Sequence, residues 1–306
     1  HPSFEAQGGA IARAWARRVV RLLDEDGPPT LAEMFQRAVV PPVGEQARAK
    51  AWHSFIEKVH DPHERMLDRA MRLFLTRQAS RLAKKIPALV EASKSLAPVT
   101  RIADALLLEI LDAAAEEARL AATAHRPVLA ALKAAIKSSL TAMAVSGVTI
   151  PPDAVDKIVT AQIGSMVTDV TATTIQAVKR IIEQGLAAGA SVNDMQAGLM
   201  RAAAFRPARA LTIARTETTR AISAGTVQAI EAVAATGVKV RKQWLSARDD
   251  VVRDTHVELD GDTVAPGEDF VSSSGATGQA PGLLGEPGED INCRCTTLPV
   301  VTEEDS

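Results

Sequence analysis

The stretch VKVRKQWLS, residues 238–246, is where the pattern of the chain changes. Its β-branched residues alternate with polar ones, which is typical of a half-buried strand. The segment CRCTTLPVV, residues 293–301, has the same character and predicts a second strand. Before about residue 245 the apolar residues recur at helical spacing instead. The sequence therefore predicts an α+β protein, in which a long N-terminal helical arm or bundle precedes a small α+β C-terminal module with a short β-sheet.

One predicted helix has a basic side. In DPHERMLDRAMRLFLTRQASRLAKKI, residues 61–86, Leu67, Met71 and Phe74 fall on one side, and arginines fall roughly opposite. Cationic side chains bind phosphates without reading base sequence, so this face is the candidate contact for double-stranded DNA, with an acidic protein surface as the alternative partner. The candidate DNA-binding residues are Arg65, Arg69, Arg72, Arg81, Lys84 and Lys85.

Capping signals predict where the later helices begin and end. Pro152 begins a helix that we expect to end in the region 185–189, where glycine supplies a left-handed cap. Ser191, followed three residues later by Asp194, is close to a capping box. Gly237 closes the last of these helices.

Length and charge divide the chain into two regions. At 306 residues it is longer than one hydrophobic core usually supports. Residues 48–101 contain 12 Lys or Arg against 5 Asp or Glu, a net of +7, whereas residues 246–306 contain 3 against 14, a net of −11. We predict a helical region, 1–169, and a module, 170–306, with an acidic, loop-rich end. The Gly-, Pro- and Ser-rich stretch 272–290 should be a long loop that is poorly ordered unless a partner holds it.

Composition excludes several classes of protein. The chain has six Phe, three Trp and no Tyr, so a surface that stacks single-stranded bases on aromatic rings is not expected. Its uncharged stretches are too short and too interrupted to span a bilayer, and we expect no membrane partner. Two cysteines indicate a reducing compartment without a disulfide framework.

Cys293 and Cys295 leave more than one function open. Residues two apart in a strand are separated by about 6.5–7 Å, so a disulfide between them would be strained. Zinc needs four ligands, and His256 with a carboxylate such as Asp250 or Asp260 would have to complete the set. A catalytic thiolate is a further alternative. We expect small buried side chains without a metal or cofactor, because free cysteine is among the most buried residue types.

No complete catalytic set is evident. His256, in SARDDVVRDTHVELDGDT (residues 246–263), could be a general acid or base of a nuclease, but no second catalytic partner stands out. Arg215, the SSSG of residues 272–275 and Glu289 follow the order found in ADP-ribosyltransferases. We assign no catalytic residue.

Glu217 is a charged residue in an otherwise apolar helix, within ARTETTR, residues 214–220. It lies three residues from Arg220 and can form a surface pair with it. Alternatively Glu217 is partly buried and reaches under the strands to an arginine such as Arg253 or Arg294, since a buried charge needs a partner.

Taken in order, these segments resemble the phage head morphogenesis family, the Mu F-like minor head proteins. The resemblance rests on GLAAGASVNDMQAGL, ARTETTR, KQWLSARDDVVRDTHVELDG, a glycine- and proline-rich loop, and EDINCRC, and it covers about residues 170–300. No motif that we can name covers the preceding residues. The residues onto which the family pattern carries over are Arg215, Thr216, Glu217, Trp244, Asp250, Arg253, His256, Asp260, Gly261, Asn292, Cys293, Arg294 and Cys295.

The resemblance implies a minor capsid protein of a tailed bacteriophage. Its partners would be the portal protein, the major capsid protein and the packaged double-stranded DNA. It would assemble in the host cytoplasm and reside in the virion head near the portal vertex, where it acts in head morphogenesis and in DNA packaging or delivery. The alternative is an enzyme module, a nuclease or an ADP-ribosyltransferase, carried in the phage head.

Overall fold

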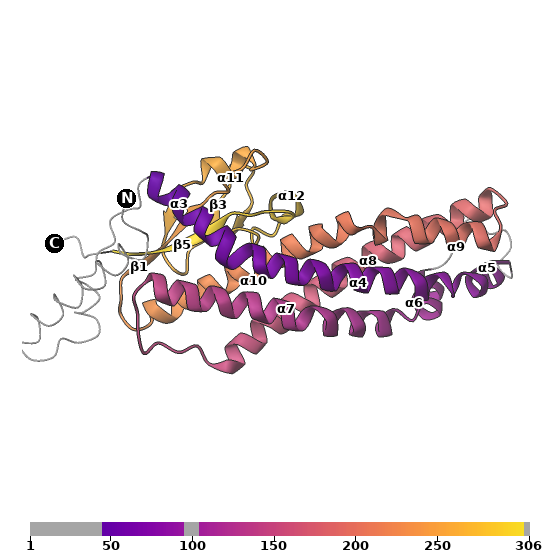
Figure 1. The fold of residues 1–306 in the computed structure, drawn as a ribbon, viewed down its shortest axis with the longest axis horizontal. Coiled ribbons are helices and arrows are strands. Elements are labelled where there is room, and N and C mark those ends of the chain that lie inside the picture. The colour runs from indigo at the N-terminus through magenta and orange to yellow at the C-terminus, as the bar shows by residue number, and fades with distance from the viewer. Residues whose placement is uncertain (1–44, 95–103, 303–306) are drawn as a thin grey trace, which may run out of the picture.

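The long helices of the molecule lie side by side and set its shape. The computed structural model describes residues 45–94 and 104–302. The long helices are α4 (Asp61–Ala83), α7 (Ala113–Ala142), α8 (Pro152–Ala187) and α10 (Pro207–Ala234). They run along the long axis, and the strands lie at one end of it (Figure 1). The predicted α+β class, with a long helical region before a small sheet, is confirmed.

Shorter helices extend both ends of this body. At the end opposite to the strands lie α5 (Ile86–Lys94), α6 (Asp104–Leu111) and α9 (Val192–Arg201) (Figure 1). At the strand end, α3 (Glu45–Phe55) leads through a π-helical turn, Ile56–His60, into α4. A single 3-10 turn, Ala203–Phe205, connects α9 to α10.

The helices pack because each buries an apolar face in a common core. Leu67, Met71 and Leu75 of α4 are almost fully buried there, as the spacing predicted. Gly225 allows the close approach of α10 to α7: a Cβ at this position would lie 2.5 Å from the carbonyl oxygen of Leu132. Glycine is therefore required at Gly225 for packing rather than for backbone conformation.

The predicted helix limits are confirmed where capping residues marked them. α8 begins at Pro152 and ends at Ala187, and Gly189 has a φ of +63°. Ser191 and Asp194 form a complete capping box at the start of α9. Gly237, with a φ of +91°, follows α10. The boundary predicted near residue 170 falls inside α8, which continues through it as one helix; the division into two regions stays a prediction.

Three antiparallel strands form the main sheet. β1 (Val240–Leu245) lies between β2 (Thr263–Val264) and β5 (Thr296–Val301), and Val240 pairs with Val301. Pro299 fits in β5 because β5 is an edge strand, where a missing N–H is tolerated. Both strand predictions are confirmed. The second strand, however, begins at Thr296, so both cysteines precede it rather than lie in it.

The prediction of a poorly ordered loop at residues 272–290 is wrong. This part of the chain contains one strand of a hairpin, β3 (Phe270–Val271) with β4 (Thr277–Gly278), and the short helix α12 (Pro287–Asp290). The buried Lys242 ammonium donates to the carbonyl oxygens of Glu268 and Gln279 at 2.6 and 3.0 Å. The Asp290 carboxylate accepts from the backbone N–H groups of Leu284 and Gly285 at 2.9 and 3.0 Å. Polar contacts within the protein thus hold this stretch in place, which the composition predicted only a partner would do.

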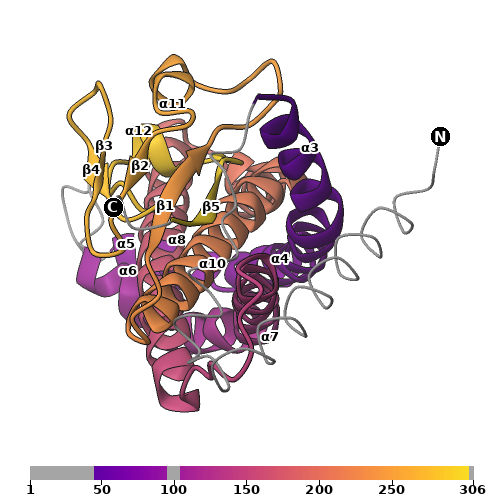
Figure 2. The same cartoon turned by 90° about the vertical axis from the view of Figure 1, so that its left-hand side faces the viewer.

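A second core joins the module to the N-terminal helices. Trp244, Phe270, Leu284 and both cysteines are buried together, and Trp52 of α3 packs against them. The Trp52 indole Nε1 donates to the carbonyl oxygen of Arg294 at 3.1 Å. In Figure 2, α3 and the β3–β4 hairpin flank β1 on opposite sides. In the described ranges, no helix is long and apolar enough to cross a lipid bilayer.

Candidate functional site

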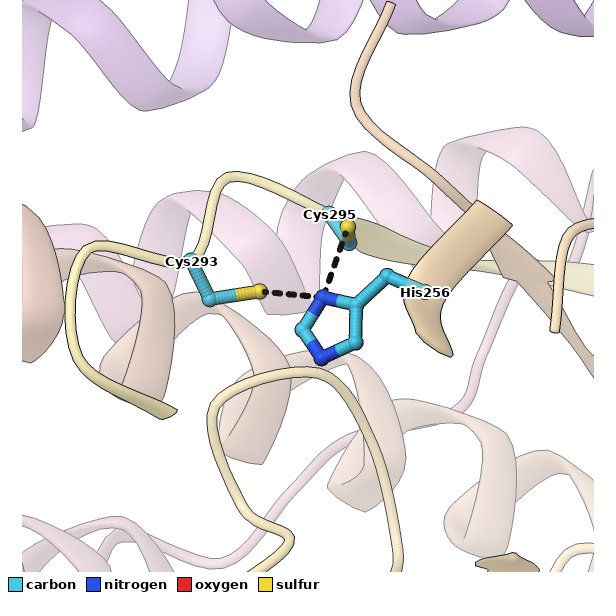
Figure 3. A group of neighbouring side chains, drawn as sticks. All are labelled: His256, Cys293 and Cys295. Atoms are coloured by element: carbon cyan, nitrogen blue, oxygen red, sulfur yellow. Dashed lines mark hydrogen bonds between the residues drawn. The ribbon is translucent and has the colours of Figure 1, made fainter. Parts of the chain in front are cut away.

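His256 and the two cysteines meet in the core of the module. His256 is carried by the short helix α11 (Asp254–Glu258), and the cysteines by the segment between α12 and β5 (Figure 3). The imidazole Nδ1 lies 3.7 Å from Sγ of Cys293 and 3.4 Å from Sγ of Cys295. All three side chains are buried, and neither cysteine is in a disulfide.

Hydroxyl groups on α10 hold the cysteine segment in place. Thr219 Oγ1 donates to the carbonyl oxygen of Cys293 at 2.6 Å, and the Asn292 N–H donates to Thr216 Oγ1 at 3.1 Å. Asn292 has a φ of +61°, a left-handed conformation that asparagine tolerates better than most residues. This turn brings both sulfurs to a single imidazole nitrogen, whereas alternate residues of a regular strand share a face but lie about 6.5–7 Å apart.

A buried carboxylate lies on the other side of the imidazole. Nε2 of His256 is 3.0 Å from Oε2 of Glu289, within ion-pair distance but not aligned for a hydrogen bond. Glu289 accepts hydrogen bonds from Thr255 at 2.9 Å and from Ser272 at 3.4 Å. Burial acts to raise the pKa of Glu289, but the hydroxyl hydrogen bonds and the adjacent His256 hold it below its usual value. The group is therefore a carboxylate fixed beside the ring.

The two thiols influence each other strongly. The hydrogen bond from Cys295 lowers the pKa of Cys293 to about 5. The same contact, together with burial, raises the pKa of Cys295 above its usual value. The backbone N–H of Ala247 donates to Sγ of Cys295 at 3.3 Å. The arrangement thus favours a thiolate at Cys293 and a thiol at Cys295.

The space beside these side chains is small. A cavity of about 20 Å³ is lined by His256, both cysteines, Asp249 and Asn292, among others. A volume of this order holds one water molecule or one ion and excludes an organic substrate. Among the described residues, the ligand atoms of His256, Cys293 and Cys295 all lie within 4.8 Å of one another. This is a donor set that a transition-metal ion can use.

The prediction that Asp250 or Asp260 completes a zinc site is wrong. Asp250 is exposed at the surface. Asp260 accepts hydrogen bonds from the Ser246 N–H and from Arg248, both at 2.8 Å. The carboxylates near the cluster are Glu289 and Asp249 instead, and neither was connected to His256 by a sequence pattern.

The prediction that Glu217 reaches an arginine such as Arg253 or Arg294 is also wrong. Glu217 is buried and pairs with Arg220 at 3.0 Å, with a further hydrogen bond from Gln162 at 3.2 Å. Burial raises the pKa of Glu217. Arg253 and Arg294 have other partners: Arg253 donates to the carbonyl oxygen of Ile291 at 2.6 Å, and Arg294 pairs with Asp249. The pairing with Arg220 was expected, but at the surface rather than in the interior.

The other motif residues are structural. Trp244 packs edge-on against His256, with ring centroids 5.2 Å apart. Gly261 has a φ of +93°, which favours glycine, and its N–H donates to the Trp244 carbonyl oxygen at 2.9 Å. Arg215 forms an ion pair with Glu64 of α4 at 3.0 Å. Trp244 and Gly261 thus support the module core, and Arg215 supports its contact with the helical body.

The enzyme alternatives are not supported by this geometry. The His256 side chain is only 1% exposed and lies between two sulfurs and a carboxylate, so a nucleic-acid substrate does not reach it. The Arg215, Ser272 and Glu289 set of a transferase is divided, because Arg215 pairs with Glu64 while Ser272 and Glu289 bond to each other. Neither set forms a site open to substrate.

The candidate DNA-binding residues are not equivalent. Arg65, Arg69, Arg72 and Lys84 are exposed, and Lys85 is partly buried. Arg72 bonds to Asp68 on its own helix at 2.7 Å. Arg81 instead makes a two-pronged ion pair with the buried Glu116 of α7, at 2.5 and 2.7 Å. That contact raises the pKa of Arg81 and gives the residue a structural role.

Two features of the site were missed from the sequence. The charges of ARTETTR do not reveal that its threonines bind the cysteine segment, or that Ser223 one turn later donates to the carbonyl oxygen of Pro281 at 2.6 Å. The order of Arg215, SSSG and Glu289 indicates a transferase and does not reveal that Glu289 lies beside His256. The run of hydroxyls on one helix was the available signal, because small polar side chains allow another backbone to approach closely.

Comparison with known proteins gives a family match and matches to individual proteins. Residues 176–298 match the family described as Phage Mu protein F like protein. Over 123 residues the chain is 35% identical to the minor head protein GP7 of Bacillus phage SPP1, covering 40% of each protein. Over 93 residues it is 42% identical to the NAD(+)–arginine ADP-ribosyltransferase EFV of Enterococcus faecalis, covering 30% of this chain and 19% of that protein. The chain therefore spans less than half of either relative, and no solved structure matches it.

Proposed function

We propose that this protein is a minor head protein of a tailed bacteriophage acting in head morphogenesis, since residues 176–298 match the Phage Mu protein F like family, as their motif predicted. The observation that carries the proposal is the similarity to a minor head protein over 123 residues. The family match covers residues 176–298, which include Trp244, Cys293 and Cys295 of the module core. The protein assembles in the host cytoplasm and resides in the virion head.

We assign the module to the portal side of the head. The module lies at one end of an elongated helical body (Figure 1), so a contact through the module leaves the rest of the body free to project. The portal protein is the proposed partner, and the major capsid protein is the alternative. Imaging of particles that carry a labelled copy of this protein tests the assignment. Label at a single vertex supports a portal partner, whereas label spread over the whole shell would exclude it.

We further propose that the exposed basic side of α4 binds packaged DNA without sequence preference. Arg65, Arg69 and Arg72 of α4 and Lys84, which directly follows it, are exposed to solvent, and cationic groups of this kind bind phosphates. Reversing the charge of these four residues should abolish the shift of duplex DNA in a low-salt gel assay. Arg81 is kept unchanged, because its substitution would remove the two-pronged ion pair of the buried Glu116 and leave it only Arg119, at 2.9 Å.

A matched control variant distinguishes DNA binding by the α4 face from an effect of the total charge of the protein. Arg126, Lys133 and Lys137 are exposed on α7, so their reversal changes net charge by a similar amount elsewhere. The control variant should still bind DNA. Equal losses in both variants would show a general charge effect, and unchanged binding in the α4 variant with a normal salt slope would exclude this face.

The transferase alternative rests on the relative from Enterococcus faecalis and is tested directly. Purified protein is incubated with labelled NAD⁺ and an arginine-containing acceptor, and transfer of label is measured against Arg215→Ala and Glu289→Ala variants. We expect no transfer above background. Transfer that disappears in both folded variants would overturn the non-enzymatic assignment.

A further inference from the structure

We propose that Cys293, Cys295 and His256 together bind one zinc ion in the core of the module. The sequence offered His256 as a third ligand but favoured a core without metal, because free cysteine is among the most buried residue types. The structure places this imidazole, on a helix 37 residues earlier in the chain than Cys293, with its ring nitrogen toward both sulfurs. The inference rests on this geometry and is independent of the role in the phage head.

The distances between the ligand atoms suit a tetrahedral zinc ion. With Zn–S about 2.3 Å, Zn–N about 2.05 Å and a tetrahedral angle, the nitrogen and each sulfur are separated by about 3.6 Å. Nδ1 of His256 lies 3.4 Å from Sγ of Cys295 and 3.7 Å from Sγ of Cys293. The three ligands therefore need little rearrangement to bind the ion.

The surroundings of the ligands are those of a metal site. A histidine that binds a metal through one nitrogen commonly donates its other N–H to a carboxylate, which fixes the ring. Glu289 lies 3.0 Å from Nε2, and a small rotation of the ring on binding would align the hydrogen bond. Glu289 is itself held by Thr255 and Ser272. On the sulfur side, the Ala247 N–H donates to Cys295, as backbone amides do to thiolates.

Charge and space favour a structural ion. One Zn²⁺ with two thiolates and a neutral imidazole has no net charge, so the complete site can be buried, whereas two thiolates alone could not. Binding releases to solvent the protons that the thiols carried. The adjacent cavity of about 20 Å³ holds one water molecule, which would complete the four ligands and keep the site neutral; Asp249 also lines the cavity, and its charge as a ligand would be balanced by Arg294. An organic substrate does not fit, so the ion stabilises the fold and does not act on a substrate.

The first test uses the unmodified protein. The protein is reduced, stripped of metal with a chelator, and titrated with Co²⁺, whose tetrahedral thiolate complexes absorb in the near-ultraviolet and the visible. We expect saturation at one equivalent, a thiolate-to-cobalt band, and loss of that band when Zn²⁺ is added. Folded protein that gives no such band, or that binds cobalt without it, would overturn the proposal whatever the variants do.

Variants then assign the ligands. Cys293→Ser, Cys295→Ser and His256→Gln should each reduce bound zinc, measured by elemental analysis, to well below one equivalent. Glu289→Gln should keep the stoichiometry but weaken affinity by about 10–100-fold, as expected of a positioning residue. His125→Gln, at an exposed site on α7, is the matched control and should bind like wild type. Zinc that stays at one equivalent in all three ligand variants would place the ion elsewhere.

Discussion

Replacing Gly225 by alanine tests whether α7 and α10 pack as closely as the structure shows. In most helix interiors this substitution is favourable, because alanine exceeds glycine in helix propensity by about 1 kcal/mol. Here the new Cβ would lie 2.5 Å from the carbonyl oxygen of Leu132 and 3.1 Å from Cβ of Ala135. Both atoms belong to rigid parts of α7, so neither can rotate away.

The size of the effect follows from that contact. Ordinary van der Waals contact begins near 3.4 Å, so α7 and α10 would have to separate by roughly 1 Å at this point. Overpacking of this kind costs about 1–3 kcal/mol. Gly225→Ala should therefore lose up to about 2 kcal/mol of unfolding free energy despite the gain in propensity.

A second glycine provides the control. Gly164 is exposed in α8 and has no atom within 4 Å of the Cβ position, so Gly164→Ala should gain about 1 kcal/mol. The difference between the two variants then isolates the packing cost. Urea denaturation followed by circular dichroism measures both on the full chain. If Gly225→Ala is at least as stable as Gly164→Ala, the close packing of α7 on α10 is incorrect.

Three further substitutions test single contacts by urea denaturation. Burial raises the pKa of Glu217, so the folded protein loses stability as pH rises from about 4.5 through the folded pKa. Over that pH range the unfolding free energy of Glu217→Gln should therefore increase relative to wild type. A difference that does not depend on pH would contradict the burial of this carboxyl. Lys242→Met leaves the carbonyl oxygens of Glu268 and Gln279 without their donor and should cost about 2 kcal/mol or more, with faster proteolysis near residue 279; unchanged proteolysis would contradict it. Ser191→Ala removes the side-chain cap of α9 and should lower the unfolding free energy by about 1 kcal/mol; an unchanged unfolding free energy would contradict the capping box.

Features encoded by neighbouring residues could be predicted from the sequence. The limits of α8 and α9 depend on Pro152, Gly189 and the Ser191 capping box, which act within one turn of the chain. The two strands were evident from β-branched alternation, and the buried side of α4 from helical periodicity. Each of these signals is local, and each was confirmed.

Partners far apart in the chain could not be predicted in the same way. Arg215 pairs with Glu64, 151 residues away, and Thr219 bonds to the Cys293 backbone, 74 residues away. Nothing in the spacing of ARTETTR distinguishes these partners from Arg253 or Arg294, because the choice is made by how α10 packs on α4 and on the cysteine segment. The prediction of a poorly ordered loop at residues 272–290 was wrong for a related reason: composition does not reveal that Lys242 donates a hydrogen bond to the carbonyl oxygen of Gln279.

The position of α10 also determines whether the module can fold alone. One side of α10 carries hydroxyls that bind the module, and the other side carries Ala210, Ile213 and Ala214, which are buried with residues of α4 and α7. A fragment of residues 170–306 would keep the first contact and expose the second, in addition to the apolar face of α8. Exposed apolar surface of this extent leads to self-association. We therefore expect this fragment to aggregate or to lack a cooperative thermal transition, whereas the full chain is monodisperse on a sizing column. A monomeric fragment that unfolds cooperatively would show that the region matching the phage family is an independent domain, attached to the helices but not dependent on them.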